Sequence, residues 1–173
     1  MKALSPGLRP GRASHPASPA GAGATRYLPI QEYLPHRGRM VLLDAVLAAE
    51  AGRIRCVATI RPDSPFCRND NVPAYVGVEY MAQAIGALIG WQSRRVGEPV
   101  RTGFLVSARK FTSQVAAYPV GARLQVEARE NWRDAEGLGV MDCVIYHPAD
   151  DIAAEATLMV FQPRNLQAYV TTT

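Results

Sequence analysis

The spacing of apolar residues along the chain predicts six strands and one long helix. From Ile54 to Ile60, apolar side chains recur at every second position, and Arg53, Arg55 and Arg61 fall on the other face, which is the period of a half-buried strand. A mostly buried strand is expected just before it, over residues 40–48. The other four strands are expected over residues 102–111, 123–132, 137–146 and 152–161.

The helix is predicted over residues 74–96, between Pro73 and Gly97. It is apolar on almost every face, so other elements must surround it. Short links between the last four strands favour antiparallel neighbours. We therefore expect an α+β domain, a curved antiparallel β-sheet wrapped around one long central helix, with an edge strand of the kind that commonly pairs across a dimer.

Composition divides the chain into one domain and two tails. Residues 1–25 are rich in Pro, Gly, Ala and Ser and cannot bury a core, so we expect a disordered N-terminal tail. The folded domain is expected over residues 26–165, and residues 166–173 form a short C-terminal tail. A total of 173 residues suits one domain with a sizeable core.

Charge and cysteine content exclude several classes of function. The net charge of +4 suits an acidic partner, but no basic stripe interleaved with aromatic residues points to nucleic acid. No apolar stretch has the ~18–20 residues of a membrane span. Three cysteines form neither a disulfide framework nor a zinc motif, so we expect a cytoplasmic protein without a metal.

One carboxylate, Glu79, interrupts the apolar helix. An unpaired charge is costly in such a setting, and an acid held there is a candidate for proton transfer near neutral pH. Gln83 follows at i+4 on the same helix face. Gly77 lies near the start of the helix, where N–H groups and the positive end of the dipole suit a thioester carbonyl.

Several short motifs, in this order and spacing, carry a resemblance to a known family. They are Leu34-Pro-His-Arg37, Met40-Val-Leu-Leu-Asp44, Val72 to Gln83, Gly103-Phe-Leu-Val106, Ala108-Arg109, Pro119 to Leu124, Gly137-Leu-Gly-Val140 and Val160-Phe-Gln-Pro163. Over about residues 27–165 the chain resembles the hotdog-fold 3-hydroxyacyl-ACP dehydratases, most closely the divergent aryl-polyene-type (ApeP-like) branch.

The resemblance implies a hotdog fold and dehydration of a carrier-bound 3-hydroxyacyl thioester to the trans-2-enoyl product, in fatty-acid or aryl-polyene-type biosynthesis. It implies no cofactor. The implied partners are an acyl carrier protein, which delivers the substrate on a phosphopantetheine arm, and a second hotdog subunit, in a homodimer or a heterodimer. Glu79 matches the family's helix acid, which handles the 3-hydroxyl group; the competing interpretation is a buried carboxylate paired with an arginine.

The chain departs from the family at the loop before the helix, where housekeeping members carry the histidine that removes the α-proton. Here residues 64–71 contain no histidine. His36 is the leading substitute, with a purely structural histidine as the alternative; Asp70 and Cys67 are further candidates. His15 falls in the expected tail and His147 in an expected turn.

Further residues are candidates for binding. Gly77, Gln83 and Tyr75 are expected to bind or position the substrate. Arg109 and Lys110 are expected to attract the acidic carrier protein, although ordinary solvated charge explains them equally well.

Two other functions remain open. A hotdog thioesterase would use a carboxylate on the same helix to activate water or attack the carbonyl. A non-catalytic subunit would instead complete a heterodimer with an active dehydratase, whose histidine would serve the shared site.

Overall fold

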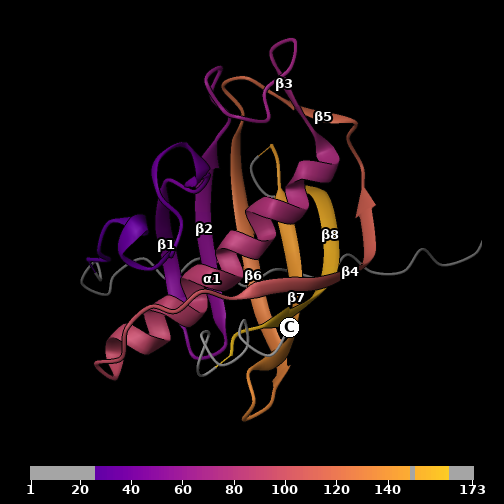
Figure 1. Cartoon of the computed structure of the whole chain (residues 1–173). Helices are drawn as coiled ribbons and strands as arrows, with labels where there is room; N and C mark the ends of the chain where they lie inside the picture. The colour runs from indigo at the N-terminus through magenta and orange to yellow at the C-terminus, as the bar shows by residue number, and fades with distance from the viewer. Residues whose placement is uncertain (1–25, 149–150, 164–173) are drawn as a thin grey trace, which may run out of the picture.

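A six-stranded antiparallel sheet packs one face against a single long helix, α1 (Figure 1). The computed structural model describes residues 26–148 and 151–163. The strand order in the sheet is β1-β2-β6-β7-β8-β4. Its elements are β1 (Ala45–Glu50), β2 (Arg53–Thr59), α1 (Gly77–Arg95), β4 (Phe104–Ser113), β6 (Arg123–Arg133), β7 (Leu138–Tyr146) and β8 (Ile152–Phe161).

A second, two-stranded sheet lies beside the start of α1 (Figure 1). It pairs β3 (Asn71–Pro73) with β5 (Ala117–Pro119). The backbone N–H of Ala74 donates to the carbonyl of Ala116 at 3.0 Å and extends this pairing to the 3-10 turn η3 (Ala74–Val76), which leads directly into α1. The small sheet therefore fixes the point at which the helix begins.

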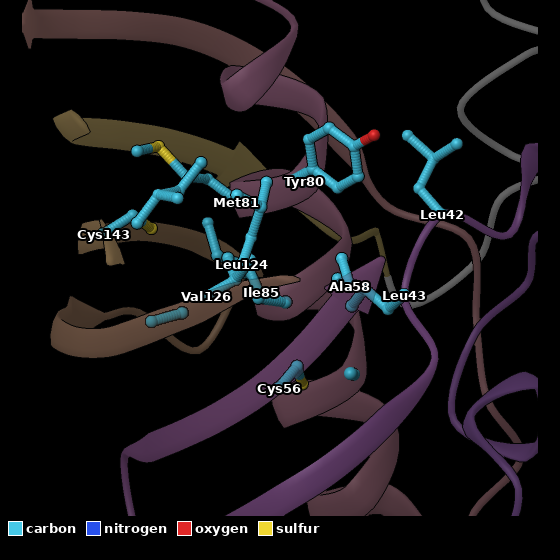
Figure 2. Close-up of a cluster of buried hydrophobic side chains, with 14 of the residues drawn as sticks. Leu42, Leu43, Cys56, Ala58, Tyr80, Met81, Ile85, Leu124, Val126 and Cys143 are labelled. Carbon is cyan, nitrogen blue, oxygen red and sulfur yellow. The ribbon is translucent and has the colours of Figure 1, made fainter. Parts of the chain in front are cut away.

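The core fills the space between α1 and the sheet. Figure 2 shows Met81 and Ile85 of α1 next to Leu124 and Val126 of β6. All four side chains are at most 1% exposed, and each contributes about 1.5–3 kcal/mol of hydrophobic stabilisation relative to an exposed side chain. The apolar side chains of the helix and those of the strands therefore pack into one common core.

The N-terminal segment covers another side of α1. Two 3-10 turns, η1 (Ile30–Glu32) and η2 (Gly38–Met40), lie in this segment. A Cβ atom at Gly90 would lie 2.0 Å from the carbonyl oxygen of Tyr33, so only glycine allows this approach of the two backbones. This close approach carries the residues that follow Tyr33 along the helix toward Glu79.

The face of the sheet opposite α1 carries an ion-pair cluster around one buried carboxylate. Glu127 of β6 accepts hydrogen bonds from Arg53 at 2.9 Å and from Arg55 at 2.7 Å. Burial raises the pKa of Glu127, but the hydrogen bonds and charges of the two arginines outweigh burial and hold it below its ordinary value. The arginines of β2 are therefore structural partners of a carboxylate.

The structure confirms the expected antiparallel sheet and single long helix, with two corrections. The strand expected over residues 40–48 begins only at Ala45, because Leu42 and Leu43 are buried outside the ladder. The helix proper begins at Gly77, after η3. Residues 1–25 and 166–173, the expected tails, lie outside the described residues, and the boundaries of the domain stay a prediction. Among the described helices, none is long and apolar enough to cross a membrane.

Candidate active site

Glu79 and His36 meet beside the first turn of α1. The Nε2 atom of His36 lies 3.8 Å from the Oε1 atom of Glu79. Their side chains are 33% and 34% exposed. The apolar sequence around Glu79 had indicated a carboxylate enclosed in the core, and the structure instead leaves it partly exposed. The two groups are too far apart for a direct hydrogen bond, but one substrate can contact both.

Gln83 holds this pair in place and is itself completely buried. Its Nε2 atom donates to Glu79 Oε1 at 2.9 Å and to the carbonyl of Met40 at 2.7 Å. Its Oε1 atom accepts from the backbone N–H of Leu42 at 2.9 Å. One side chain therefore orients the carboxylate and also ties the segment after His36 to the helix.

An apolar pocket of about 180 Å³ extends from this pair along α1. His36 and Glu79 are among its lining residues, together with Ala82, Ile85, Gly86 and Ile89 of the helix. The opposite wall comes from the segments at the start of β4 and the end of β8, namely Arg101, Gly103, Phe104, Leu105, Val160, Phe161 and Gln162. The pocket thus joins a polar pair to an apolar channel.

A second depression lies on the other side of Glu79. Tyr75 lines it with Arg68 and Glu79, together with apolar residues of the 64–71 loop and of the start of α1. Tyr75 is 70% exposed. The carboxylate is therefore reached from two directions, through an apolar pocket and through an open depression.

Gly77 lies apart from both pockets. Its backbone N–H is hydrogen-bonded to the carbonyls of Ala74 and Tyr75 in η3. A Cβ atom at this position would approach Ile145 and Tyr118 to about 3 Å, so the glycine packs into the sheet side of the helix. Its own N–H is consequently occupied by the turn, and the structure does not bring it to the pair of His36 and Glu79.

Arg109 and Lys110 are exposed on β4, the edge strand of the sheet. Neither lines the two pockets at Glu79. Lys110 has a positive φ of 53°, at a break in the pairing of β4 with β8. The two cations therefore lie farther along β4 than the residues that form the wall of the apolar pocket.

The other candidate bases do not reach the pocket that holds Glu79. Cys67 and Asp70 belong to the loop before β3, and neither residue lines the pocket along α1. His147 lies at the end of β7, with its Nδ1 atom 3.4 Å from the carbonyl of Arg123. His15 falls outside the described residues, and within residues 26–148 and 151–163 no cluster of metal-binding side chains occurs.

Arg101, Phe104 and Gln162 line the pocket but were not among the residues expected at the site. A signal was nevertheless present, because Phe104 begins a run of three consecutive apolar residues at the start of an edge strand. Such a run breaks the two-residue period and indicates that the strand is covered on both faces. All three residues of the run are more than one third exposed in the single chain.

Comparison with known proteins shows what this chain is similar to. A family model described as ApeP dehydratase, of the ApeP-like family, matches residues 28–171. Among solved structures, one chain of the dehydratase heterocomplex ApeI:P from Xenorhabdus doucetiae is 31% identical, with a TM-score of 0.79. That match covers 85% of this chain and 98% of the other. No curated protein matches the chain.

More distant structures share the fold alone. A hypothetical thioesterase with coenzyme A from Streptococcus pneumoniae is 14% identical over 70% of this chain and 88% of its own, with a TM-score of 0.52. The PaaI protein of the Escherichia coli phenylacetic acid degradation operon is 10% identical over 67% and 80%, with the same TM-score of 0.52. The matches confirm the hotdog fold that the motifs implied.

Proposed function

Because this chain belongs to the ApeP-like dehydratase family, we propose that it dehydrates a 3-hydroxyacyl thioester carried by an acyl carrier protein. The product is the trans-2-enoyl thioester, in fatty-acid or aryl-polyene-type biosynthesis. One observation carries the proposal. An imidazole and a carboxylate from the same chain lie 3.8 Å apart in the lining of a pocket whose other walls are mostly apolar.

In the proposed reaction the two groups divide the proton transfers. Neutral His36 takes the proton from C2 of the substrate, and the protonated carboxyl of Glu79 gives its proton to the 3-hydroxyl oxygen. The C3–O bond breaks with its electron pair on oxygen, water leaves, and the C2–C3 double bond forms. Transfer of the proton from His36 back to Glu79 then restores both groups.

The neighbouring residues have supporting roles in this proposal. Gln83 positions the carboxylate, and Tyr75 lines the depression through which the thioester end of the substrate approaches. Gly77 has no direct contact with the substrate in this proposal, because its N–H is bonded within η3; the positive end of the α1 dipole would favour the developing oxyanion. No organic cofactor takes part in the proposed reaction.

The acyl carrier protein would dock on exposed cations of this chain. A carrier protein is acidic and its arm bears a phosphate, so exposed cations attract it. Arg109 and Lys110 on β4 are our proposed carrier contacts, and they are exposed in the single chain.

A second hotdog subunit would cover the start of β4. The strand ends the sheet, and its Phe104, Leu105 and Val106 are 39%, 42% and 54% exposed. Exposed apolar edges of this kind are normally protected by pairing. The similarity to a chain of a named heterocomplex favours a heterodimer over a homodimer.

A non-catalytic role in such a heterodimer is the second candidate. It is favoured by one observation, the absence of histidine from the loop at residues 64–71. In that case the partner would supply the base, and Glu79 would be the contribution of this chain to a shared site.

The deciding experiment incubates the purified full chain with a 3-hydroxyacyl-ACP and follows the loss of one water by mass spectrometry. We expect turnover by the wild type and a loss of about 10²–10⁴-fold in Glu79→Gln and in His36→Gln, the range of a general acid or base. His147→Gln, a histidine at the end of β7, is the matched control and should retain full activity.

Each other outcome has its own meaning. Activity only after mixing with a histidine-bearing hotdog subunit, undiminished in His36→Gln, would establish the shared-site alternative. Release of free thiol without an enoyl product would identify a thioesterase and refute the dehydration proposal.

A further inference from the structure

Arg68 places a guanidinium group in the open depression beside Glu79. It is exposed, and it lines this depression of about 350 Å³ together with Glu79 and Tyr75. Its Nη1 atom donates to the carbonyl of Cys67 at 3.0 Å, and it forms no ion pair with a carboxylate in the part of the chain that the structure describes. The positive charge is therefore not neutralised by a neighbour, and the remaining N–H groups are available to a ligand.

A tight hairpin fixes the backbone of Arg68. Its N–H donates to the carbonyl of Asn71 at 2.8 Å, and its carbonyl accepts from the N–H of Asn71 at 3.0 Å. The two residues between them, Asn69 and Asp70, have φ angles of 49° and 58°, the left-handed conformation of a two-residue type I′ turn. Because Asn71 is also the first residue of β3, the hairpin is continuous with the segment that leads into α1. Arg68 therefore has a defined position relative to Glu79.

A space separates the charged groups of Arg68 and Glu79. Both residues line the depression, yet no ion pair joins them, so the guanidinium nitrogens lie more than 4.0 Å from the carboxylate oxygens. The rest of the wall is mostly apolar and consists of Pro65, Phe66, Pro73, Val76 and Val78. Among the side chains that line the depression, Arg68 and Tyr75 are therefore the hydrogen-bond donors for a substrate group placed in this space.

The proposed reaction requires such a donor in this space. Removal of the C2 proton moves negative charge onto the thioester carbonyl oxygen, and a preorganised donor at that oxygen lowers the barrier. The N–H of Gly77 is bonded within η3 and does not supply it. When C2 lies at His36 and the 3-hydroxyl at Glu79, the carbons beyond C3 follow the apolar pocket along α1. The carbonyl then lies on the opposite side, in the depression that Arg68 lines.

We propose that the guanidinium of Arg68 donates a hydrogen bond to the thioester carbonyl oxygen and stabilises the enolate-like charge that develops there. Arg68 is then a third catalytic residue beside His36 and Glu79. It gains and loses no proton, because arginine stays protonated throughout. The electron pair of the C2–H bond forms the C2–C3 double bond, and the pair of the C3–O bond leaves with water. The inference rests on the proposed function, which places the substrate between these groups.

The first measurement records polarisation of the carbonyl without turnover. The probe is the hexanoyl thioester of N-acetylcysteamine with a carbon-13 label at the carbonyl, which has neither a 3-hydroxyl group to eliminate nor a phosphate. Isotope-edited infrared spectroscopy compares its carbonyl band free in solution and bound to the full chain, in the assembly that the chain forms. We expect the bound band to lie at lower frequency in the wild type. Arg68→Lys should keep part of this shift, and Arg68→Leu should lose it.

The second measurement is turnover of the 3-hydroxyhexanoyl thioester of the same small carrier. Arg68→Leu should lower kcat by about 10²–10³-fold, the effect of removing one oxyanion donor, with little change in KM. Arg39→Leu is the matched control, because Arg39 also donates to a backbone carbonyl, that of Asp63, but lines a different depression. It should keep both the band shift and the activity. Melting temperatures verify that all variants are folded.

The proposal fails on any of three results. The first is an unshifted carbonyl band with the wild type. The second is a shift that survives in Arg68→Leu at the size seen in the wild type. The third is a loss of activity in Arg68→Leu only with substrates on the acyl carrier protein, with turnover of the small thioester unchanged, which would assign Arg68 to the carrier or to the phosphate of its arm.

Failure of the dehydration proposal gives a different pattern. A band shift that depends on Arg68, without loss of water from the hydroxylated substrates, would retain Arg68 as the carbonyl donor and refute only the reaction. Turnover that depends on Glu79 but not on Arg68 would retain the reaction and refute the role of Arg68.

Discussion

Replacement of Gln83 by leucine tests whether one buried amide holds the candidate active site together. The substitution keeps an apolar side chain of similar size at a fully buried position. It removes the hydrogen bonds to Glu79, to the carbonyl of Met40 and to the N–H of Leu42. The side chain of Glu79 is 34% exposed, so water can replace its lost bond.

The expected magnitude follows from the N–H of Leu42, whose hydrogen bond to Gln83 is buried, because Met40 is 41% exposed and water can replace the bond to its carbonyl. A buried donor left without a partner costs about 1–3 kcal/mol, so the free energy of unfolding should fall by about 1–3 kcal/mol. For a domain of this size, 1 kcal/mol corresponds to roughly 3–4 °C in Tm, and the melting temperature should fall by about 3–12 °C.

The assay is denaturant and thermal unfolding of the wild type, Gln83→Leu and the control Gln31→Leu. Gln31 is exposed in η1, and its substitution should change the free energy by no more than about 0.5 kcal/mol. Activity gives the second readout, because a mispositioned Glu79 should lower kcat as well. A Gln83→Leu variant as stable as the control would refute the assigned role of the amide.

Two further predictions concern packing and charge. Gly90→Ala should lower the free energy of unfolding by about 1–3 kcal/mol in chemical denaturation, because the new Cβ atom clashes with the Tyr33 carbonyl. The control is Gly86→Ala, whose new Cβ atom contacts only a side-chain methyl at 3.3 Å, so its stability should be nearly unchanged. Glu127 has a folded pKa below its ordinary value of 4.5, so its stabilisation is present above pH 4.5 and is lost as pH falls through the folded value. The stability gap between wild type and Glu127→Gln should therefore narrow on acidification, and a constant gap would contradict this.

Much of the fold follows from local periodicity. The strands predicted over residues 123–132, 137–146 and 152–161 match β6, β7 and β8 to within one residue. Periodicity fails where apolar side chains are buried without joining a ladder. Leu42 is the example, since its backbone N–H bonds to the side chain of Gln83 and not to a strand. The three-residue strands β3 and β5 are too short to give a periodic signal.

The candidate site was only partly predictable. The i, i+4 spacing placed Glu79 and Gln83 on one helix face, and the structure joins them by a hydrogen bond of 2.9 Å. The approach of His36 depends on the packing of Tyr33 against Gly90, which no local pattern reveals. Arg101 follows α1 by only a few residues, yet its place in the wall requires the pairing of β4 with β8.

The site geometry also changes what a partner subunit would have to supply. His36 and Glu79 come from one chain and already lie 3.8 Å apart, so on our proposal the partner need not provide a base. What the single chain lacks is cover for the apolar start of β4, where Phe104 and Leu105 line the pocket and remain more than one third exposed. An open wall admits water, which weakens the electrostatic contacts of the pair and competes with the acyl chain. A partner requirement would therefore reflect closure of the pocket. Activation of this chain by the partner should therefore persist when the partner's own catalytic histidine is replaced.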